Sequence, residues 1–174
     1  MAKKAVKIIS TALLVILAFG IFLSFNNDIG IPKAMMENDA RSSQKINDDW
    51  KVEEAISNTM AAFIFYPDNK ADHTFSVYVN RLGLSFGYFF RGGGDITETE
   101  KYIAEFTVEG NNERAFISMN EQKVERLEID DGNSVQIIEI DNNKPFAIIL
   151  PVNAGNIVFY DVNGDIVETR KQAL

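Results

Sequence analysis

The segment IISTALLVILAFGIFLSF, residues 8–25, divides this chain into a short basic head and a long acidic remainder. It contains no charged residue, and its only polar side chains are two serines and one threonine. At 1.5 Å per residue, about 20 helical residues span a hydrocarbon core that is ~30 Å thick, and a helix satisfies its own backbone polar groups there. We therefore predict a transmembrane anchor that begins at Ile8 and ends at Phe25.

The charges on the two sides of this segment predict its orientation. Lys3, Lys4 and Lys7 precede it and Asp28 follows it. Because basic residues stay on the cytoplasmic side, residues 1–7 form a cytoplasmic tail and residues 26–174 lie outside the cell membrane, in the envelope. The alternative is a cleaved signal peptide with a site at Ala18-Phe19-Gly20, which would release a secreted domain.

The remainder is strongly acidic and lacks cysteine. Residues 26–174 carry 14 basic and 25 acidic side chains, a net charge of −11. This charge disfavours nucleic acid and anionic lipid headgroups, and it favours basic ligands or divalent cations. The absence of cysteine excludes disulfides, thiolate nucleophiles and cysteine-ligated zinc. We predict no cofactor and no bound metal.

The remainder is long enough for one domain and a linker. Residues 26–47 are polar and are interrupted by Gly30 and Pro32, so we predict a stalk. Residues 48–174 then form a single α+β domain. Apolar residues recur at three- and four-residue steps from Trp50 to Ile64, and Pro67 follows, which predicts an amphipathic helix over residues 48–66.

Short runs rich in β-branched and aromatic residues follow that helix, separated by turn residues. We predict nine strands, over residues 74–80, 82–90, 102–109, 114–120, 124–130, 134–140, 146–152, 156–162 and 165–169. Their short connections require antiparallel neighbours. The apolar run FAIIL (residues 146–150) indicates a strand covered on both faces. The predicted fold is one helix packed on an antiparallel meander, and the pattern leaves the number of sheet layers open.

Residues 82–90 form the most unusual of these strands. On one face Gly83, Ser85 and Gly87 leave almost no side chain until Phe89. Some element must approach this bare face closely. We favour tight packing of another part of the chain or a bend. The alternative is a groove for a ligand or partner, lined by these four residues and by aromatic side chains that include Tyr66.

Three further patterns are weaker. His73 is the only histidine and lies in a polar loop, so we predict an exposed loop residue rather than a catalytic base. Residues 161–168 alternate oxygen-bearing side chains, but Asn163-Gly164 favours a hairpin turn over a calcium loop. The glycine-rich residues 91–95 lack the lysine and helix of a phosphate loop and are predicted to be a flexible connection.

These observations favour a non-enzymatic, membrane-anchored envelope protein whose outer domain binds a partner protein or a small ligand. No catalytic residue is predicted. The alternative is a carboxylate-dependent enzyme that acts on cell-wall polymer, since 25 acidic residues leave room for a pair ~5–10 Å apart.

Overall fold

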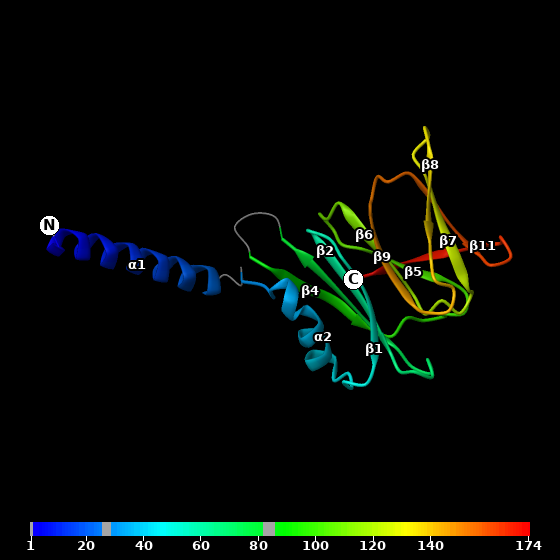
Figure 1. Cartoon of the computed structure of the whole chain (residues 1–174), viewed down its shortest axis with the longest axis horizontal. Coiled ribbons are helices and arrows are strands. Elements are labelled where there is room, and N and C mark those ends of the chain that lie inside the picture. The colour runs from blue at the N-terminus through cyan, green and yellow to red at the C-terminus, as the bar shows by residue number, and fades with distance from the viewer. Residues whose placement is uncertain (1, 26–28, 82–85) are drawn as a thin grey trace.

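The computed structural model describes residues 2–25, 29–81 and 86–174 of the chain. Its first helix, α1 (Ala2–Phe25), extends away from a folded body that contains all the other elements (Figure 1). A 3-10 helix, η1 (Lys33–Met35), and a second α-helix, α2 (Met36–Gln44), follow it. No helix in the described part of the chain is both long enough and apolar enough to cross a membrane.

Twelve strands of the described residues form three four-stranded sheets. The first sheet contains β1 (Lys51–Ile56), β2 (Met60–Tyr66), β3 (Thr74–Asn80) and β4 (Tyr88–Gly94), in that order. The second sheet contains β12 (Thr169–Ala173), β5 (Ile103–Thr107), β6 (Glu113–Ser118) and β9 (Phe146–Pro151). The third sheet contains β11 (Ile166–Val167), β10 (Asn156–Asp161), β7 (Val124–Asp130) and β8 (Val135–Glu139).

The pairings within these sheets are antiparallel except for β12 with β5, which is parallel. The predicted α+β class with antiparallel sheets is therefore confirmed. The number of layers, which the sequence left open, is three.

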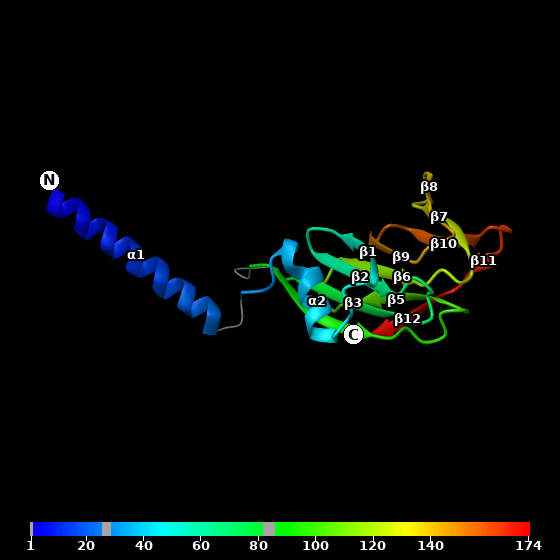
Figure 2. The ribbon, with the colours of Figure 1, turned by 60° about the horizontal axis from the view of Figure 1, so that its bottom comes forward.

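The sheets are stacked with the second sheet in the middle (Figure 2). Between the first and second sheets lies one core, in which the ring centres of Phe75 and Phe106 are 4.4 Å apart. Between the second and third sheets lies another core, in which Phe116 and Phe159 are 5.2 Å apart. The side chains of β9 contribute to both cores, which confirms the predicted strand with two covered faces.

The predicted helix over residues 48–66 is wrong, because this region forms the antiparallel hairpin of β1 and β2. The Ser57 hydroxyl closes the turn by accepting the N–H groups of Thr59 at 3.1 Å and Met60 at 2.9 Å. All seven residues of β2 are buried, since α2 covers one face and the second sheet covers the other. A strand buried on both faces has a continuous apolar run, which periodicity does not distinguish from a buried helix.

The helix that packs on the first sheet is α2, which lies within the predicted polar stalk of residues 26–47. Its Met36 and Ala40 are completely buried against the face of the sheet that carries Phe63 and Tyr78. The Tyr78 hydroxyl donates a hydrogen bond to Asp39 of α2 at 2.8 Å. One cluster of apolar contacts and the hydrogen bonds that join Asp39 and Gln44 to the first sheet thus hold a mostly polar helix in place.

The buried position of Tyr78 and its hydrogen bond to Asp39 should make the fold less stable at alkaline pH. Burial, followed by Asp39, raises the pKa of Tyr78 well above its usual value, and burial with Glu53 raises the pKa of Tyr66 to about 12. A raised pKa in the folded state means that the stabilisation is complete below the unfolded value of about 10 and is lost as the pH rises above it.

We therefore expect the free energy of unfolding to fall from about pH 10 upward, by up to ~1.4 kcal/mol per pH unit for each of these tyrosines. Denaturant titrations of the wild-type chain and of Tyr78→Phe between pH 9 and pH 12 measure this slope, and the variant should lack the contribution of Tyr78. Tyr160→Phe, at a half-exposed position on the third sheet, is the control. Equal slopes in wild type and Tyr78→Phe would contradict the prediction.

Two predictions around β4 are wrong. The strand begins at Tyr88 and ends at Gly94, whereas the prediction placed it over residues 82–90, of which residues 82–85 lie outside the described part. The predicted flexible connection at residues 91–95 is largely strand, and Gly93 pairs with Ser76. A Cβ atom on Gly93 would lie 2.7 Å from the Phe75 oxygen and 2.8 Å from Gln44 Oε1, so glycine permits the close approach of α2.

The turn between β10 and β11 confirms the predicted hairpin. The Asp161 carboxylate accepts the N–H groups of Asn163 at 2.8 Å and Asp165 at 2.9 Å, and these backbone hydrogen bonds lower the pKa of Asp161. Gly164 has a φ of +83°, as a tight turn of this kind requires.

Candidate functional site

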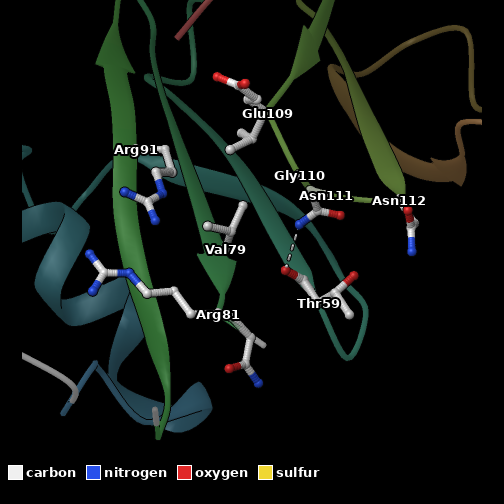
Figure 3. A pocket seen from close by; sticks show the side chains of 10 residues that line it. Thr59, Val79, Arg81, Arg91, Glu109, Gly110, Asn111 and Asn112 are labelled. Carbon is white, nitrogen blue, oxygen red and sulfur yellow. Dashed lines mark hydrogen bonds between the residues drawn. The ribbon is translucent and has the colours of Figure 1, made fainter. Parts of the chain in front are cut away.

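A pocket of about 210 Å³ opens at one edge of the first core, between the first and second sheets. Its walls come from the β1–β2 turn, from the end of β3, from β4 and from the turn between β5 and β6 (Figure 3). The lining residues are Thr59, Val79, Asn80, Arg81, Arg91, Val108, Glu109, Gly110, Asn111 and Asn112. Val79 and Val108 form the apolar part of the wall, and polar or charged side chains form most of the rest.

A β-bulge places Arg91 in this pocket. Tyr78 pairs with Phe90 and Val77 pairs with Gly92, so Arg91 is an extra residue in β4 with no partner in β3. Bulges of this kind redirect a side chain and occur often next to functional sites. The Nε atom of Arg91 is buried and has no hydrogen-bond partner among the described residues. A buried donor without an acceptor is costly, so an acceptor bound in the pocket would be stabilised there.

Arg81 provides the second guanidinium group, directly after β3. Its Cζ atom lies 4.1 Å from the centre of the Phe89 ring, a cation–π contact that orients the side chain. Figure 3 shows both arginine side chains next to β4. Two guanidinium groups on one wall are suited to bind a carboxylate or a phosphate, because each offers a planar fork of donors.

The opposite wall is held by a hydrogen bond between two turns. Asn111 Nδ2 donates to the Thr59 carbonyl at 3.1 Å (Figure 3). Beside this contact, Glu113 accepts hydrogen bonds from the hydroxyl groups of Ser57 and Thr59, which fixes the β1–β2 turn. The wall is therefore built from side chains that also maintain the fold.

The charge of the pocket is opposite to that of the domain. Glu109 is its only carboxylate, against the two arginines. The net charge of −11 predicted basic ligands or divalent cations, but this pocket offers cationic donors instead. No group of three or more metal-ligating side chains gathers in the described part of the chain.

The structure does not bring the predicted groove residues together. Gly87 is covered by the chain itself, because a Cβ atom there would lie 2.8 Å from the Gly30 carbonyl carbon and 2.8 Å from the Ile31 oxygen. Tyr66 is buried at the far end of β2, opposite Lys51. Gly83 and Ser85 lie outside the described residues. Of the predicted site residues that the structure describes, Phe89 alone contacts a residue of the pocket, Arg81.

His73 has a structural role. It is half-buried, and its Nε2 atom accepts the N–H group of Ile96 at 2.9 Å. The predicted exposed loop residue therefore joins two loops.

Sequence reasoning missed the two arginines, although a signal was present. Residues 80–94 contain Arg81 and Arg91, many aromatic residues and no acid, within an otherwise acidic chain. Basic side chains that flank an apolar stretch in this way indicate an anion-binding or interfacial surface.

Fold and pocket together define a three-layered α+β domain with an arginine-lined site. Comparison of the chain with protein-family models, with curated proteins and with solved structures gives no match.

Proposed function

We propose that this chain is a single-pass envelope protein, anchored in the cell membrane by residues 8–25, whose outer domain binds a small anionic ligand in the arginine-lined pocket. The observation that carries the binding function is Arg91, which a bulge directs into the pocket with an unpaired, buried Nε donor. The ligand would present a carboxylate or phosphate group to Arg91, which is half-buried, whereas Arg81 is exposed.

The membrane part of the proposal is supported by the sequence and by the exposure of α1. The side chains of five consecutive residues, 13–17, are each 62–68% exposed. Consecutive helical positions point in all directions around the axis, so α1 is apolar on every side. Exposed apolar surface of this extent is unfavourable in water and is stabilised in lipid.

The binding function is preferred to catalysis because of the carboxyl groups. A carboxylate-dependent enzyme needs a cleft-facing pair with a raised pKa in one member. The described carboxyl groups with a clearly shifted pKa are Glu98, Asp131 and Asp161, and each of these pKa values is lowered. Lysine, backbone N–H and arginine donors cause these shifts, and none of the three residues lines the pocket.

We expect inorganic phosphate to bind the full chain in maltoside micelles, which contain no phosphate of their own. In a nitrogen–proton correlation spectrum, the Nε resonance of Arg91 should shift during the titration. Arg91→Gln should weaken binding by about tenfold or more, since a charge-assisted hydrogen bond contributes ~1.5–3 kcal/mol.

Arg126→Gln is the matched control, because Arg126 is also half-buried but pairs with Glu128 on the third sheet at 3.1 Å. This variant should bind phosphate as the wild type does. Equal affinity in wild type and Arg91→Gln, or a titration in which no pocket resonance moves, would contradict the proposed binding site.

A further inference from the structure

The connection between α1 and the folded body is very short. Only residues 26–28 separate Phe25, at the end of α1, from Ile29. An extended chain covers at most ~3.6 Å per residue, so Ile29 lies within about 14 Å of the end of α1 whatever the path of the connection. The predicted stalk over residues 26–47 is therefore replaced by a short tether that is followed by η1 and α2.

Ile29 is in turn fixed to the start of β4. Ile29 forms a bridge with Phe86, and Ile31 forms one with Tyr88. Ile31 donates to the Tyr88 carbonyl at 2.7 Å and accepts the Tyr88 N–H group at 2.8 Å. In both views the end of α1 lies next to this end of β4 (Figures 1 and 2). One particular end of the body is thus held close to α1.

That end exposes apolar and basic side chains. Ile29 is 56% exposed and Phe86 is 57% exposed. Lys33, four residues after Ile29, and Arg81 are also exposed. Arg81 directly follows Asn80, which pairs with Tyr88 at the start of β4. We call Ile29, Lys33, Arg81 and Phe86 the α1-side rim.

The charge of the outer part is segregated around this rim. Residues 29–36 and 80–94 contain three basic residues, Lys33, Arg81 and Arg91, and no acidic one. The rest of residues 26–174 holds 11 basic residues and all 25 acidic ones. A uniformly acidic body would be repelled from phosphate-bearing lipid headgroups, whereas this arrangement directs its basic, apolar end toward them and its acidic bulk away.

We infer that the α1-side rim rests on the lipid bilayer, with Phe86 and Ile29 in the interfacial layer and Lys33 and Arg81 at the lipid phosphates. This inference depends on the proposed anchoring of α1. Phenylalanine and aliphatic side chains insert into the interfacial layer, and long basic side chains place their apolar stems in it while their charges reach the headgroups. The bilayer is the inferred partner because the short tether holds this end of the body close to the point where α1 would leave the membrane.

The test uses tryptophan emission from the full chain in vesicles whose lipids are brominated near the headgroup end of the acyl chains. Bromine quenches indoles that reach this depth. In Phe86→Trp with Trp50→Phe, we expect about a twofold loss of emission, because an interfacial apolar side chain lies ~5–10 Å into the headgroup and acyl boundary.

The wild-type chain supplies the first control through Trp50, its only tryptophan. α2 runs from Met36, near Ile31, to Gln44, whose side chain bonds to Phe75 and Thr74 at the other end of the first sheet. Trp50 follows that end, and the six steps from Tyr88 to Gly94 in β4 alone cover ~20 Å. Trp50 should therefore keep its emission.

Leu14→Trp with Trp50→Phe supplies the second control, because it reports on α1 alone. Quenching at position 14 without quenching at position 86 would contradict the rim inference and leave the anchor standing. Quenching at both position 86 and Trp50 would also contradict it, since the body would then lie on its side. No quenching at position 14 would overturn the proposed anchor itself.

Discussion

Replacing Gly87 with alanine is expected to lower the free energy of unfolding by about 3 kcal/mol, the sum of ~1–2 kcal/mol of backbone strain and ~1–3 kcal/mol of overpacking. Gly87 has a φ of +90°, which alanine adopts only with strain. Its Cβ atom would also meet the backbone of Gly30 and Ile31 at 2.8 Å. Backbone atoms held by hydrogen bonds yield less than a side chain, so both costs should appear.

Two other glycines separate these costs. Gly164 has a φ of +83° and no atom within 4 Å of an added Cβ atom, so Gly164→Ala should show only the strain of ~1–2 kcal/mol. Gly30 is outside the left-handed region, but its Cβ atom would lie 2.6 Å from the Tyr88 oxygen. Gly30→Ala should therefore show only the overpacking cost of ~1–3 kcal/mol.

Denaturant unfolding of the full chain in maltoside micelles, followed by near-ultraviolet circular dichroism, measures the three variants. The expected order of destabilisation places Gly87→Ala first. If Gly87→Ala is no less stable than Gly164→Ala, residues 29–31 do not pack against β4, and the short tether on which the rim inference depends loses its support.

Most strands of the second and third sheets could be predicted, because their sequences carry a regular local signal. The exception is β12, which begins where the predicted strand over residues 165–169 ends and pairs in parallel with β5. The predicted range 124–130 coincides with β7, the range 114–120 overlaps β6, and the turn at Asn163-Gly164 has the expected form. Half-exposed strands alternate, and asparagine–glycine turns accept a positive φ. These local signals do not depend on which layer covers the strand.

β1 and β2 of the first sheet could not be predicted in the same way, because their burial depends on elements that are distant in the sequence. The sequence of β2 resembles that of a buried helix because both faces of the strand are buried. α2 covers one face, and strands more than 40 residues away cover the other. The sequence of α2 resembles a polar linker because its buried surface is small. Among its described residues, only Met36 and Ala40 are completely buried. Tertiary packing overrides local pattern in both cases.

The bare face of residues 82–90 was predicted to approach another element, and at Gly87 that element is the chain's own residues 30 and 31. The pocket was missed because a β-bulge directs Arg91 into it, and no sequence pattern predicts this bulge. Its walls also combine four segments that are distant in sequence, so only the folded chain places Arg91 opposite Asn111.

The second large effect is expected in α1. Leu14 and Leu17 are more than 60% exposed and lie near the middle of residues 8–25. A lysine near the centre of an inserted helix costs ~2.5–3.5 kcal/mol, so Leu14→Lys with Leu17→Lys should disfavour insertion by about 6 kcal/mol. Leu14→Met with Leu17→Met keeps the apolar surface and is the matched control.

Protease treatment of spheroplasts that produce the full chain, followed by an alkaline wash and mass measurement of the membrane pellet, tests the anchor most directly. We expect a membrane-bound fragment that retains the original amino terminus and α1, while the outer domain is digested. The double lysine variant should leave no such fragment, and the double methionine variant should leave the same one as wild type. Release of the intact wild-type chain by the alkaline wash, or a mature chain in the medium that begins near Ile21, would contradict the account.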